Sequence, residues 1–283
     1  MKKSKVWFIT GASRGFGLEI AKAALKTGDK VVATVRSRPE LLLKQLNNDE
    51  NLFVSVLDVN DKKLVERSVK EALDKFRSID VLVNNAGYGL LGAIEENLDE
   101  EIRQNYETNV FGLLNVIREI LPHMRKQRSG HIINLSSVGG LAGFAGWGMY
   151  CSTKFAVEGI TESLALELAP LGIYATTVEP GFFRTDFLDR SSLKTSKNII
   201  ADYTETAGAM RNQMMIVNKK QPGSAKKLAQ AFITLANSNH PPVHLMLGKD
   251  TLDVYRQKMA TIEKEIKEWH KIITSTDHDD VTV

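Results

Sequence analysis

Apolar runs rich in β-branched residues alternate with helical patterns along most of the chain. Seven runs have the length and composition of buried strands, and they lie at residues 6–10, 30–35, 52–57, 81–84, 131–135, 174–179 and 243–247. Helical patterns lie between them, at approximately 16–27, 39–47, 61–76, 98–127, 150–170 and 223–237. Strands that alternate with helices and are apolar enough to be covered on both faces predict an α/β fold. Its core would be a doubly wound parallel sheet of about seven strands between two layers of helices.

Composition places limits on the class of protein. The chain has 283 residues, 43% of them hydrophobic, which suffices for a sizeable core. Because no repeat, linker or low-complexity segment divides it, we expect a single domain over residues 1–283. The formal net charge of +3 gives no electrostatic basis for binding nucleic acid. No stretch approaches the ~20 apolar residues of a membrane span.

The compartment and metal chemistry follow from a few residues. The first apolar run is too short for a signal peptide. The only cysteine, Cys151, excludes an intrachain disulfide and a cysteine-rich metal site, and the six histidines show no metal-ligand spacing. We therefore expect a cytoplasmic protein without a catalytic metal.

Two segments stand outside the alternation of strands and helices. Residues 182–221 exceed the length of most connections. They carry the apolar side chains Phe182, Phe183, Phe187, Leu188, Tyr203, Met210, Met214 and Met215. Such a segment can fold over a site as a lid and form an apolar pocket, although the same residues can also pack the base of the insertion. Residues 250–283 predict a charged amphipathic helix to about 273 and a frayed end. This helix is expected on the surface, with contact to a partner as the alternative.

A glycine pattern follows the first strand. Gly11, Gly15 and Gly17 form a Gly-x-x-x-Gly-x-Gly loop that opens a helix. The glycines allow a tight turn and close approach of the backbone, and a helix N-terminus favours a pyrophosphate. In a β-α-β unit this pattern predicts dinucleotide binding, with a merely structural turn as the alternative.

The end of the second strand indicates which dinucleotide binds. NAD-selective folds usually place a carboxylate there, whereas this chain has Arg36, and Arg14 lies in the glycine loop. Two guanidinium groups can clamp a 2′-phosphate through paired hydrogen bonds. The sequence therefore predicts NADP (NADPH preferred over NADH), with Arg38 as a spare candidate for the clamp.

A hydroxyl, a phenol and an ammonium are spaced for chemistry on a carbonyl. Tyr150 and Lys154 are four residues apart, so they share one face of a helix, and a Gly-rich loop lets Ser137 approach Tyr150. A phenol with a pKa of roughly 10 needs that pKa lowered for acid–base work near neutrality. The ammonium and the helix N-terminus both act in that direction, while Ser137 can hold the substrate oxygen. The pair alone is also typical of an ordinary contact on a solvated helix.

Together these residues resemble the short-chain dehydrogenase/reductase family, in particular its carbonyl reductase and hydroxysteroid dehydrogenase branch. The resemblance covers nearly the whole chain and implies a Rossmann-type fold. Several separated motifs carry it: Thr10-Gly11-Ala12-Ser13-Arg14-Gly15-Phe16-Gly17, Asp58-Val59, Asn84-Asn85-Ala86-Gly87, Thr108-Asn109-Val110-Phe111-Gly112 and Pro180-Gly181-Phe182-Phe183-Arg184-Thr185.

The resemblance implies a role for each matching residue. Tyr150 would be the general acid in reduction and the base in oxidation, and Lys154 would lower its pKa and hold the nicotinamide ribose. Ser137, rather than the adjacent Ser136, would bind the substrate oxygen, and Asn109 would carry a water that links Lys154 to solvent. The remaining matches imply a cofactor site that also includes Tyr150 and Lys154; its other members are Gly11, Ser13, Arg14, Gly15, Phe16, Gly17, Arg36, Asp58, Val59, Asn85, Ala86, Gly87, Pro180, Gly181 and Thr185.

The function expected is NADP(H)-dependent interconversion of a ketone or aldehyde and an alcohol by hydride transfer. The branch and the lid suggest a hydrophobic small-molecule substrate, with Phe144, Trp147 and Met149 adding to its pocket or simply anchoring their loop. The family commonly dimerises through helices matching 98–127 and 150–170, so a homodimer or homotetramer is expected. The alternative function is an NADP-binding regulator without turnover, which the intact catalytic set disfavours. Epimerase or dehydratase chemistry is also disfavoured, because nothing resembles a nucleotide-sugar site.

Overall fold

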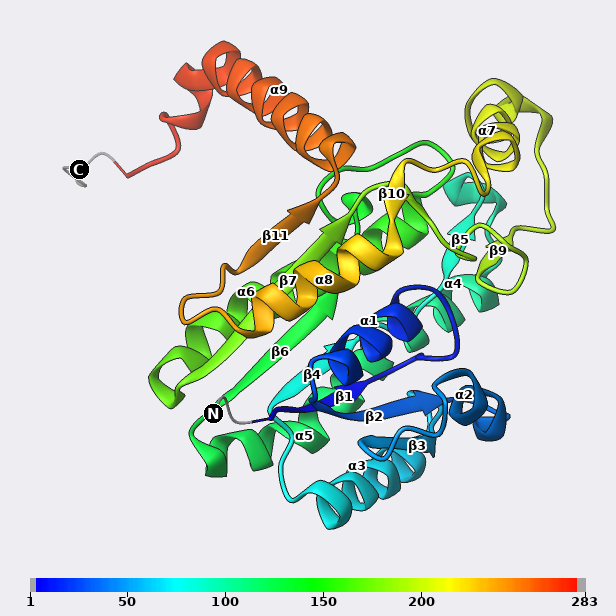
Figure 1. Ribbon diagram of the computed structural model, residues 1–283. Helices are drawn as coiled ribbons and strands as arrows, with labels where there is room; N and C mark the ends of the chain where they lie inside the picture. Colours follow the sequence, from blue (N-terminus) through cyan, green and yellow to red (C-terminus); the bar gives the residue numbers. More distant parts are fainter. Residues whose placement is uncertain (1–3, 279–283) are drawn as a thin grey trace.

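A seven-stranded parallel sheet forms the centre of the molecule in the computed structural model, which describes residues 4–278 (Figure 1). The strand order is β3-β2-β1-β4-β6-β7-β11, and every neighbouring pair is parallel. The seven predicted strands are confirmed, with these bounds: β1 Val6–Ile9, β2 Lys30–Val35, β3 Leu52–Val56, β4 Val81–Asn84, β6 Gly130–Leu135, β7 Ile173–Pro180 and β11 His244–Leu247.

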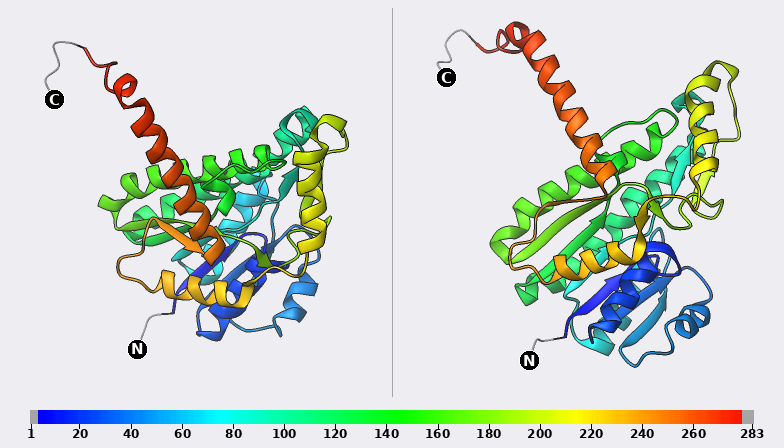
Figure 2. Two further views of the ribbon diagram at one scale, coloured as in Figure 1. Left: turned by 90° about the horizontal axis from the view of Figure 1, so that it is seen from above. Right: turned by 45° about the horizontal axis from the view of Figure 1, so that its top comes forward.

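Helices cover both faces of this sheet, as the apolar strands predict (Figures 1 and 2). Successive residues of β1 show the alternation, since Trp7 packs in one hydrophobic cluster and Phe8 in the other. The first cluster joins the sheet to α1 (Gly15–Lys26), α2 (Pro39–Gln45) and α8 (Ala225–Ala236). The second joins it to α3 (Lys62–Phe76), α5 (Leu113–Gln127) and α6 (Gly148–Leu168).

The helical pattern predicted over 98–127 is divided by a change of helix type. The structure has α4 at Asp99–Tyr106, a π-helical segment at Glu107–Gly112 and then α5. A π-helical turn inserts an extra residue and so rotates the side chains that follow it, and such turns often occur at functional sites. Residue periodicity does not reveal this insertion, because α4 is almost entirely polar and buries only Asn105, so it has no apolar pattern from which a shift could be read.

The segment 182–221, called the lid segment below, is anchored by short strands that the sequence does not predict. β8 (Phe183–Arg184) pairs with β10 (Gly223–Ser224) at its base, and β9 (Leu193–Thr195) pairs with β5 (Gly89–Leu91). Strands of two or three residues are too short to show a period. The segment also contains α7 (Ala209–Val217). The short helical turns of the chain are Ile94–Glu96, Val138–Gly140, Ala169–Leu171, Ala201–Tyr203 and the π-helical Thr204–Gly208.

The last helix, α9 (Lys249–Ile273), follows β11 and extends away from the body of the molecule (Figures 1 and 2). Its first turn is fixed to the fold, where Thr251 is buried and its Oγ1 donates to the Leu247 carbonyl at 3.2 Å. Within residues 4–278, no helix combines the length and apolarity needed to cross a membrane.

From the burial of side chains in the sheet core we can predict how far the free energy of unfolding falls when one of them is removed. Leu82, in the middle of β4, is 0% exposed, whereas Leu166 on α6 is 80% exposed. We expect Leu82→Ala to lower the free energy of unfolding by about 2–5 kcal/mol, because it leaves a cavity. The matched Leu166→Ala should change it by less than about 0.5 kcal/mol. Urea unfolding measures both, and equal effects would contradict this assignment of the core.

Candidate active site

A cleft of about 550 Å³ opens at the carboxyl ends of the central strands, which is where parallel α/β sheets commonly bind ligands. It brings together residues from distant parts of the sequence. Nearly all of the predicted site residues line it: Gly11, Ser13, Arg14, Gly15, Phe16, Arg36, Asp58, Val59, Asn85, Ala86, Gly87, Ser137, Tyr150, Lys154, Pro180, Gly181 and Thr185. The two exceptions are Gly17 and Asn109, which lie behind this wall.

The glycine loop has the conformation that its residues predict. Gly11 and Gly15 have φ angles of 67° and 57°, which residues with a side chain rarely adopt. A Cβ on Gly17 would lie 2.6 Å from the Gly11 carbonyl oxygen and 2.7 Å from Asn85 Nδ2, so this glycine serves close packing beneath the loop. Asn85 also holds the loop directly, since its Nδ2 donates to the carbonyls of Thr10 and Gly11 at 2.8 and 3.0 Å.

The loop ends in a helix N-terminus suited to an anion. At the N-cap of α1, Arg14 makes no side-chain cap hydrogen bond, and the first turn of this helix contains no acidic residue. The first backbone N–H groups of a helix have no partner within it, and together with the helix dipole they favour negative charge. The residues present therefore fit a pyrophosphate.

The two arginines predicted as a phosphate clamp differ in their surroundings. Arg36 follows β2 at the cleft wall, and its side chain is exposed. Arg14 Nη2 instead donates to the Ser191 carbonyl at 3.0 Å and to Ser192 Oγ at 2.7 Å. Arg14 thus joins the cofactor loop to the lid segment, which leaves Arg36 as the freer guanidinium for a phosphate.

Ser137, Tyr150 and Lys154 meet at the other end of the cleft. Ser137 follows β6, while Tyr150 and Lys154 lie one turn apart in the first half of α6. Lys154 Nζ donates to the Leu135 carbonyl at 2.7 Å and lies 5.7 Å from the centre of the Tyr150 ring. Ser137 Oγ accepts from the Gly139 backbone N–H at 3.1 Å, and Ser137 and Tyr150 line the same cleft. Ser136 is buried, and its Oγ has no hydrogen-bond partner among residues 4–278.

Burial controls the acidities at this end of the cleft. Desolvation raises the pKa of Tyr150 above its usual value, and the nearby Ser137 hydroxyl acts the other way with less effect. Desolvation also lowers the pKa of Lys154 to about 8, against the opposing effect of the Glu158 carboxylate. The expected lowering of the phenol pKa is therefore wrong for the protein without a bound cofactor. The reason is that removal from water outweighs the nearby ammonium.

Asn109 lies in the π-helical segment and connects three parts of the site. Its Oδ1 accepts from the Tyr88 backbone N–H at 3.0 Å, and its Nδ2 donates to the Tyr88 carbonyl at 3.0 Å and to Thr153 Oγ1 at 3.1 Å. Thr153 in turn donates to the Tyr150 carbonyl at 2.7 Å. A Cβ on Gly87 would lie 3.0 Å from Asn109 Oδ1 and 4.0 Å from Lys154 Nζ, so Asn109 sits immediately behind Gly87.

Aromatic and methionine side chains enclose Tyr150. The rings of Trp147 and Phe187 have centres 5.5 and 5.7 Å from that of Tyr150, and they stack on each other at 6.4 Å. Met214 and Cys151 are buried in the same cluster, and burial raises the pKa of the Cys151 thiol to about 11.

The apolar residues proposed for the pocket divide into two groups. Most line the cleft, namely Phe144, Trp147, Phe182, Phe183, Phe187, Leu188, Met210 and Met214. Met149, Tyr203 and Met215 are not among the lining residues, and the Met215 side chain is 71% exposed.

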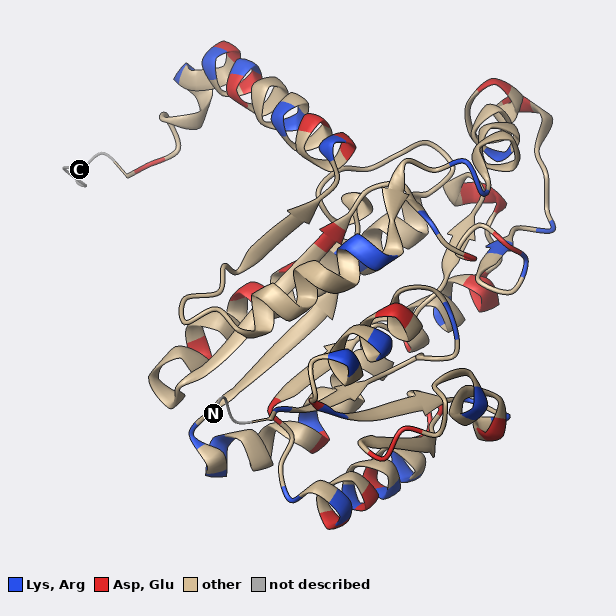
Figure 3. Ribbon diagram, viewed as in Figure 1, with Lys and Arg blue, Asp and Glu red and all other residues tan. Residues whose placement is uncertain are grey.

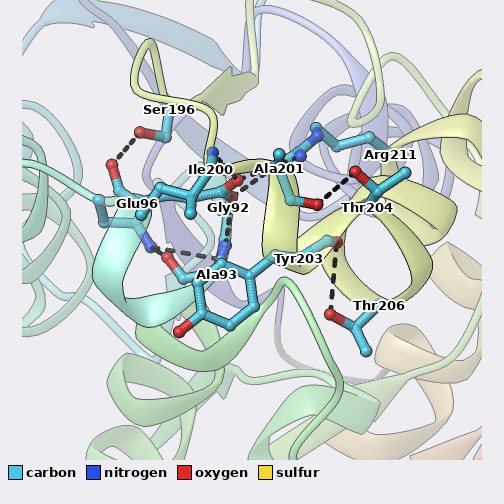
Figure 4. A network of polar contacts seen from close by, with 11 residues as sticks. Gly92, Ala93, Glu96, Ser196, Ile200, Ala201, Tyr203, Thr204, Thr206 and Arg211 are labelled. Atoms are coloured by element: carbon cyan, nitrogen blue, oxygen red, sulfur yellow. Dashed lines mark hydrogen bonds and ion pairs between the residues drawn. The ribbon is translucent and has the colours of Figure 1, made fainter.

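A buried ion pair fastens the lid segment over this end of the cleft (Figure 4). Arg211 on α7 donates to Glu96 through Nη1 and Nη2, at 2.6 and 3.2 Å, and the Glu96 side chain is 0% exposed. Glu96 also accepts from the backbone N–H groups of Ala93 and Ile200 at 2.8 and 3.0 Å. Ser196 Oγ donates to the Glu96 carbonyl. These contacts, chiefly the bond with Arg211, hold the pKa of Glu96 down at about 2.

The structure also contains a cluster that the sequence did not suggest. Glu158 on α6, Glu179 on β7 and His244 on β11 lie together behind the site; His244 Nδ1 is 3.5 Å from Glu158 Oε2 and 3.2 Å from Glu179 Oε1. Desolvation and the Glu158 charge raise the pKa of Glu179 to about 7. The ligand atoms of these three residues lie within 4.8 Å of one another, close enough to hold a metal ion. Spacing along the chain cannot reveal this cluster, because its members come from three elements.

Comparison with known proteins identifies the family. The short chain dehydrogenase family model matches residues 5–196. Oxidoreductase BOA17 of Botryotinia fuckeliana is 36% identical over 271 residues, which cover 95% of this chain and 98% of that protein. The 3-ketodihydrosphingosine reductase of Bacteroides thetaiotaomicron is 35% identical over 246 residues, covering 86% and 88%.

Solved structures that resemble this chain indicate the same family. A short-chain dehydrogenase from Streptomyces avermitilis superposes with a TM-score of 0.90 at 38% identity, covering 98% of this chain and 100% of that one. ElxO with NADP bound has a TM-score of 0.74 at 29% identity, covering 89% and 100%. A Burkholderia phymatum short-chain dehydrogenase/reductase in complex with NAD has a TM-score of 0.81 at 25% identity, covering 93% and 95%. On this evidence the chain belongs to the short-chain dehydrogenase family and is an oxidoreductase.

Proposed function

We propose that this protein uses NADP(H) to interconvert a hydrophobic ketone or aldehyde and the corresponding alcohol. The observation that carries the proposal is the meeting of Ser137, Tyr150 and Lys154 in a cleft that begins at the glycine loop. When bound, the nicotinamide supplies or accepts the hydride at the carbonyl carbon. The most informative experiment is NADPH oxidation with a panel of ketones, aldehydes, steroids and retinoids. The alternative function as a regulator predicts binding of NADPH without turnover of any of them.

The protein's own residues then handle the oxygen and its proton. Tyr150 donates its phenolic proton to the carbonyl oxygen during reduction and accepts it back during oxidation, and Ser137 holds that oxygen by a hydrogen bond. Because burial keeps the free phenol protonated, the site is ready to act as an acid before substrate arrives. Lys154, with its pKa lowered to about 8, can exchange a proton near neutrality.

A route for proton exchange runs behind Tyr150. Asn109 and Thr153 lie next to Lys154 and are hydrogen bonded to each other at 3.1 Å. We infer that Asn109 orients a water between Lys154 and solvent. Hydrogen bonds with the backbone of Tyr88 fix the Asn109 side chain. Asn109 therefore acts by positioning this water and does not contact the reacting carbonyl.

The choice of NADP rests on the charge at the end of β2. Arg36 is exposed at the cleft wall, and the strand ends without the carboxylate that would bind the ribose hydroxyls of NAD. A guanidinium pairs well with a phosphate through charge-assisted hydrogen bonds. Asp58 and Val59 line the same part of the cleft, where the adenine would lie, and Thr185 lies where it could hold the nicotinamide carboxamide.

The substrate class follows from the walls around Tyr150. The wall beside Tyr150 is apolar, because it is formed by Trp147, Phe187 and Met214. A substrate carbonyl bound there has few polar partners besides Ser137 and Tyr150. Binding at such a wall favours an apolar body attached to the carbonyl. One relative is named as a reductase of a keto compound, 3-ketodihydrosphingosine, which is compatible with this class. A cytoplasmic homodimer or homotetramer is part of the same proposal.

Replacing the phenol tests the chemical role of Tyr150. We expect Tyr150→Phe to lower kcat at least about 100-fold, because it removes the proton donor, and to leave the Kd for NADPH nearly unchanged. Steady-state rates and fluorescence titration of NADPH measure the two quantities. Tyr174→Phe is the control, because it removes a hydroxyl at the start of β7, away from the cleft, that donates to the Asn239 carbonyl at 2.9 Å. Retained turnover in Tyr150→Phe would exclude this role.

Replacing Arg36 tests the preference for NADP. Loss of charge-assisted hydrogen bonds to a phosphate should raise the Kd for NADPH about 10- to 100-fold with Arg36→Ala, while the Kd for NADH changes less than about threefold. Calorimetry with both cofactors measures this difference. Arg38→Ala, two residues along the chain, is the matched control. If Arg38→Ala has the larger effect, the phosphate clamp is misassigned.

Breaking the ion pair tests the lid segment. Removing one partner of a buried pair costs about 3–5 kcal/mol, so we expect Arg211→Met to raise KM for an apolar ketone at least about fivefold and to speed amide exchange in residues 201–217. The Glu96→Gln/Arg211→Met double variant leaves no buried charge and should recover part of both effects. Unchanged KM and exchange in Arg211→Met would show that the pair does not hold the lid segment closed.

The same pair gives a pH dependence with a definite sign. The pKa of Glu96 falls from an ordinary 4.5 to about 2 in the folded protein. Its stabilising contribution is therefore complete above about pH 4.5 and is lost as the pH falls toward about 2. Amide exchange in residues 201–217 should speed up over this range in the wild type, once corrected for intrinsic rates, and less so in the double variant. An equal acid response in both proteins would contradict the assignment to Glu96.

A further inference from the structure

The apolar residues of α9 follow a heptad pattern. Spacings of three and four residues alternate along the helix from Leu252 to Ile273, which is the pattern of a and d positions in a coiled coil. The positions are Leu252, Tyr255, Met259, Ile262, Ile266, Trp269 and Ile273. A helix that packs only on its own fold has no need to keep this stripe over its whole length.

Only the first half of the stripe is held by the body of the molecule. Tyr255 and Ile262 are half-buried, and Lys258 Nζ donates to the Leu141 carbonyl at 2.6 Å and lies 4.6 Å from the centre of the Phe155 ring. From Glu263 to His278 every residue is exposed. The outer half of α9 therefore extends past the body, as both views of Figure 2 show.

The exposed half carries large side chains that are costly to leave in water. Ile266 is 40% exposed, Trp269 60%, Ile272 58% and Ile273 50%. Three helical turns without tertiary support are marginally stable in water, and within this half the one ion pair between side chains of the described residues is Lys264–Glu268 at 3.7 Å. A covering partner would both bury these side chains and support the helix.

The charges beside the stripe indicate a second copy of the same helix. Both signs alternate along α9 (Figure 3). In a parallel, in-register pair, a g position lies near the e position five residues further along the partner helix. That geometry sets Glu265 near His270 of the second copy, where the imidazole can donate a hydrogen bond to the carboxylate. The nearly balanced charge of the outer half offers little attraction for an anionic membrane surface.

We propose that the outer half of α9 pairs, parallel and in register, with α9 of a second copy of this chain. The contact lies on the part of α9 beyond Lys258, the residue that rests on Phe155 of α6. It joins two molecules through Ile266, Trp269 and Ile273 and leaves the cleft of each open to its own substrate.

Light-scattering mass measurement on the full chain tests the contact. We expect Ile266→Glu/Trp269→Glu to halve the molecular mass relative to the wild type, whether the wild type is a dimer or a tetramer. Lys264→Glu changes the net charge by the same amount on the opposite side of the helix, and it should keep the wild-type mass. Circular dichroism and NADPH binding report that each variant is folded. Equal masses for wild type and double variant, or a monomeric wild type, would overturn the proposal.

Cysteine cross-linking tests the orientation. In a parallel pair, position a faces its own copy, so Ile266→Cys should form an intermolecular disulfide under mild oxidation. Lys264→Cys, on the outer side, should not. The native Cys151 is buried and its thiol has a raised pKa, so it does not interfere. Absence of the Ile266→Cys disulfide in a protein that still self-associates would exclude the parallel arrangement. Binding of the wild-type monomer to lipid vesicles through Trp269 would instead identify a membrane surface as the occupant.

Discussion

The hydrogen bond between Lys154 and the carbonyl of Leu135 is the contact on which the arrangement of the site depends. It joins α6 to the end of β6 at 2.7 Å, and Ser137 follows that strand directly. A buried ammonium must keep its hydrogen bonds, since an unpaired buried charge is costly. With Lys154 fixed in this way, Tyr150 one helical turn earlier is directed toward Ser137 and the cleft. Helix, strand and loop are thus held in one geometry by a group that also belongs to the proposed chemistry.

Burial has two opposing effects around Tyr150. The aromatic wall of Trp147 and Phe187 shields the phenol from water and forms the surface on which the proposed apolar substrate would bind. The same exclusion of water raises the pKa of the phenol and lowers that of Lys154, so each group is pushed toward its neutral form. A neutral phenol beside an amine that titrates near pH 8 suits donation of a proton to a carbonyl oxygen. The positive charge of an oxidised nicotinamide cofactor would favour the phenolate, so that Tyr150 could accept the proton in the reverse reaction.

Local patterns predicted the features that depend on residues close in sequence. Continuous apolar runs rich in β-branched residues located all seven strands, and the glycine loop and the Tyr150–Lys154 pair located the two ends of the cleft. Features made by distant residues could not be predicted in this way. Arg14 contacts Ser192, which lies 178 residues further along the chain, and Glu158, Glu179 and His244 meet only once β7 and β11 pair. The π-helical segment around Asn109 follows the almost entirely polar α4, so no change in an apolar pattern marks it. The expected pKa of Tyr150 was wrong because the sequence shows the ammonium nearby but not the depth of burial.

Isotope transfer tests the central claim most directly. With NADPH deuterated at the transferable position of nicotinamide C4, reduction of an apolar ketone should place one deuterium on the former carbonyl carbon of the alcohol, and mass spectrometry would detect it. Direct transfer also predicts that this label is kept in ordinary water, because the hydride never exchanges with solvent. An alcohol without the label, or consumption of NADPH without any alcohol, would contradict hydride transfer at this site.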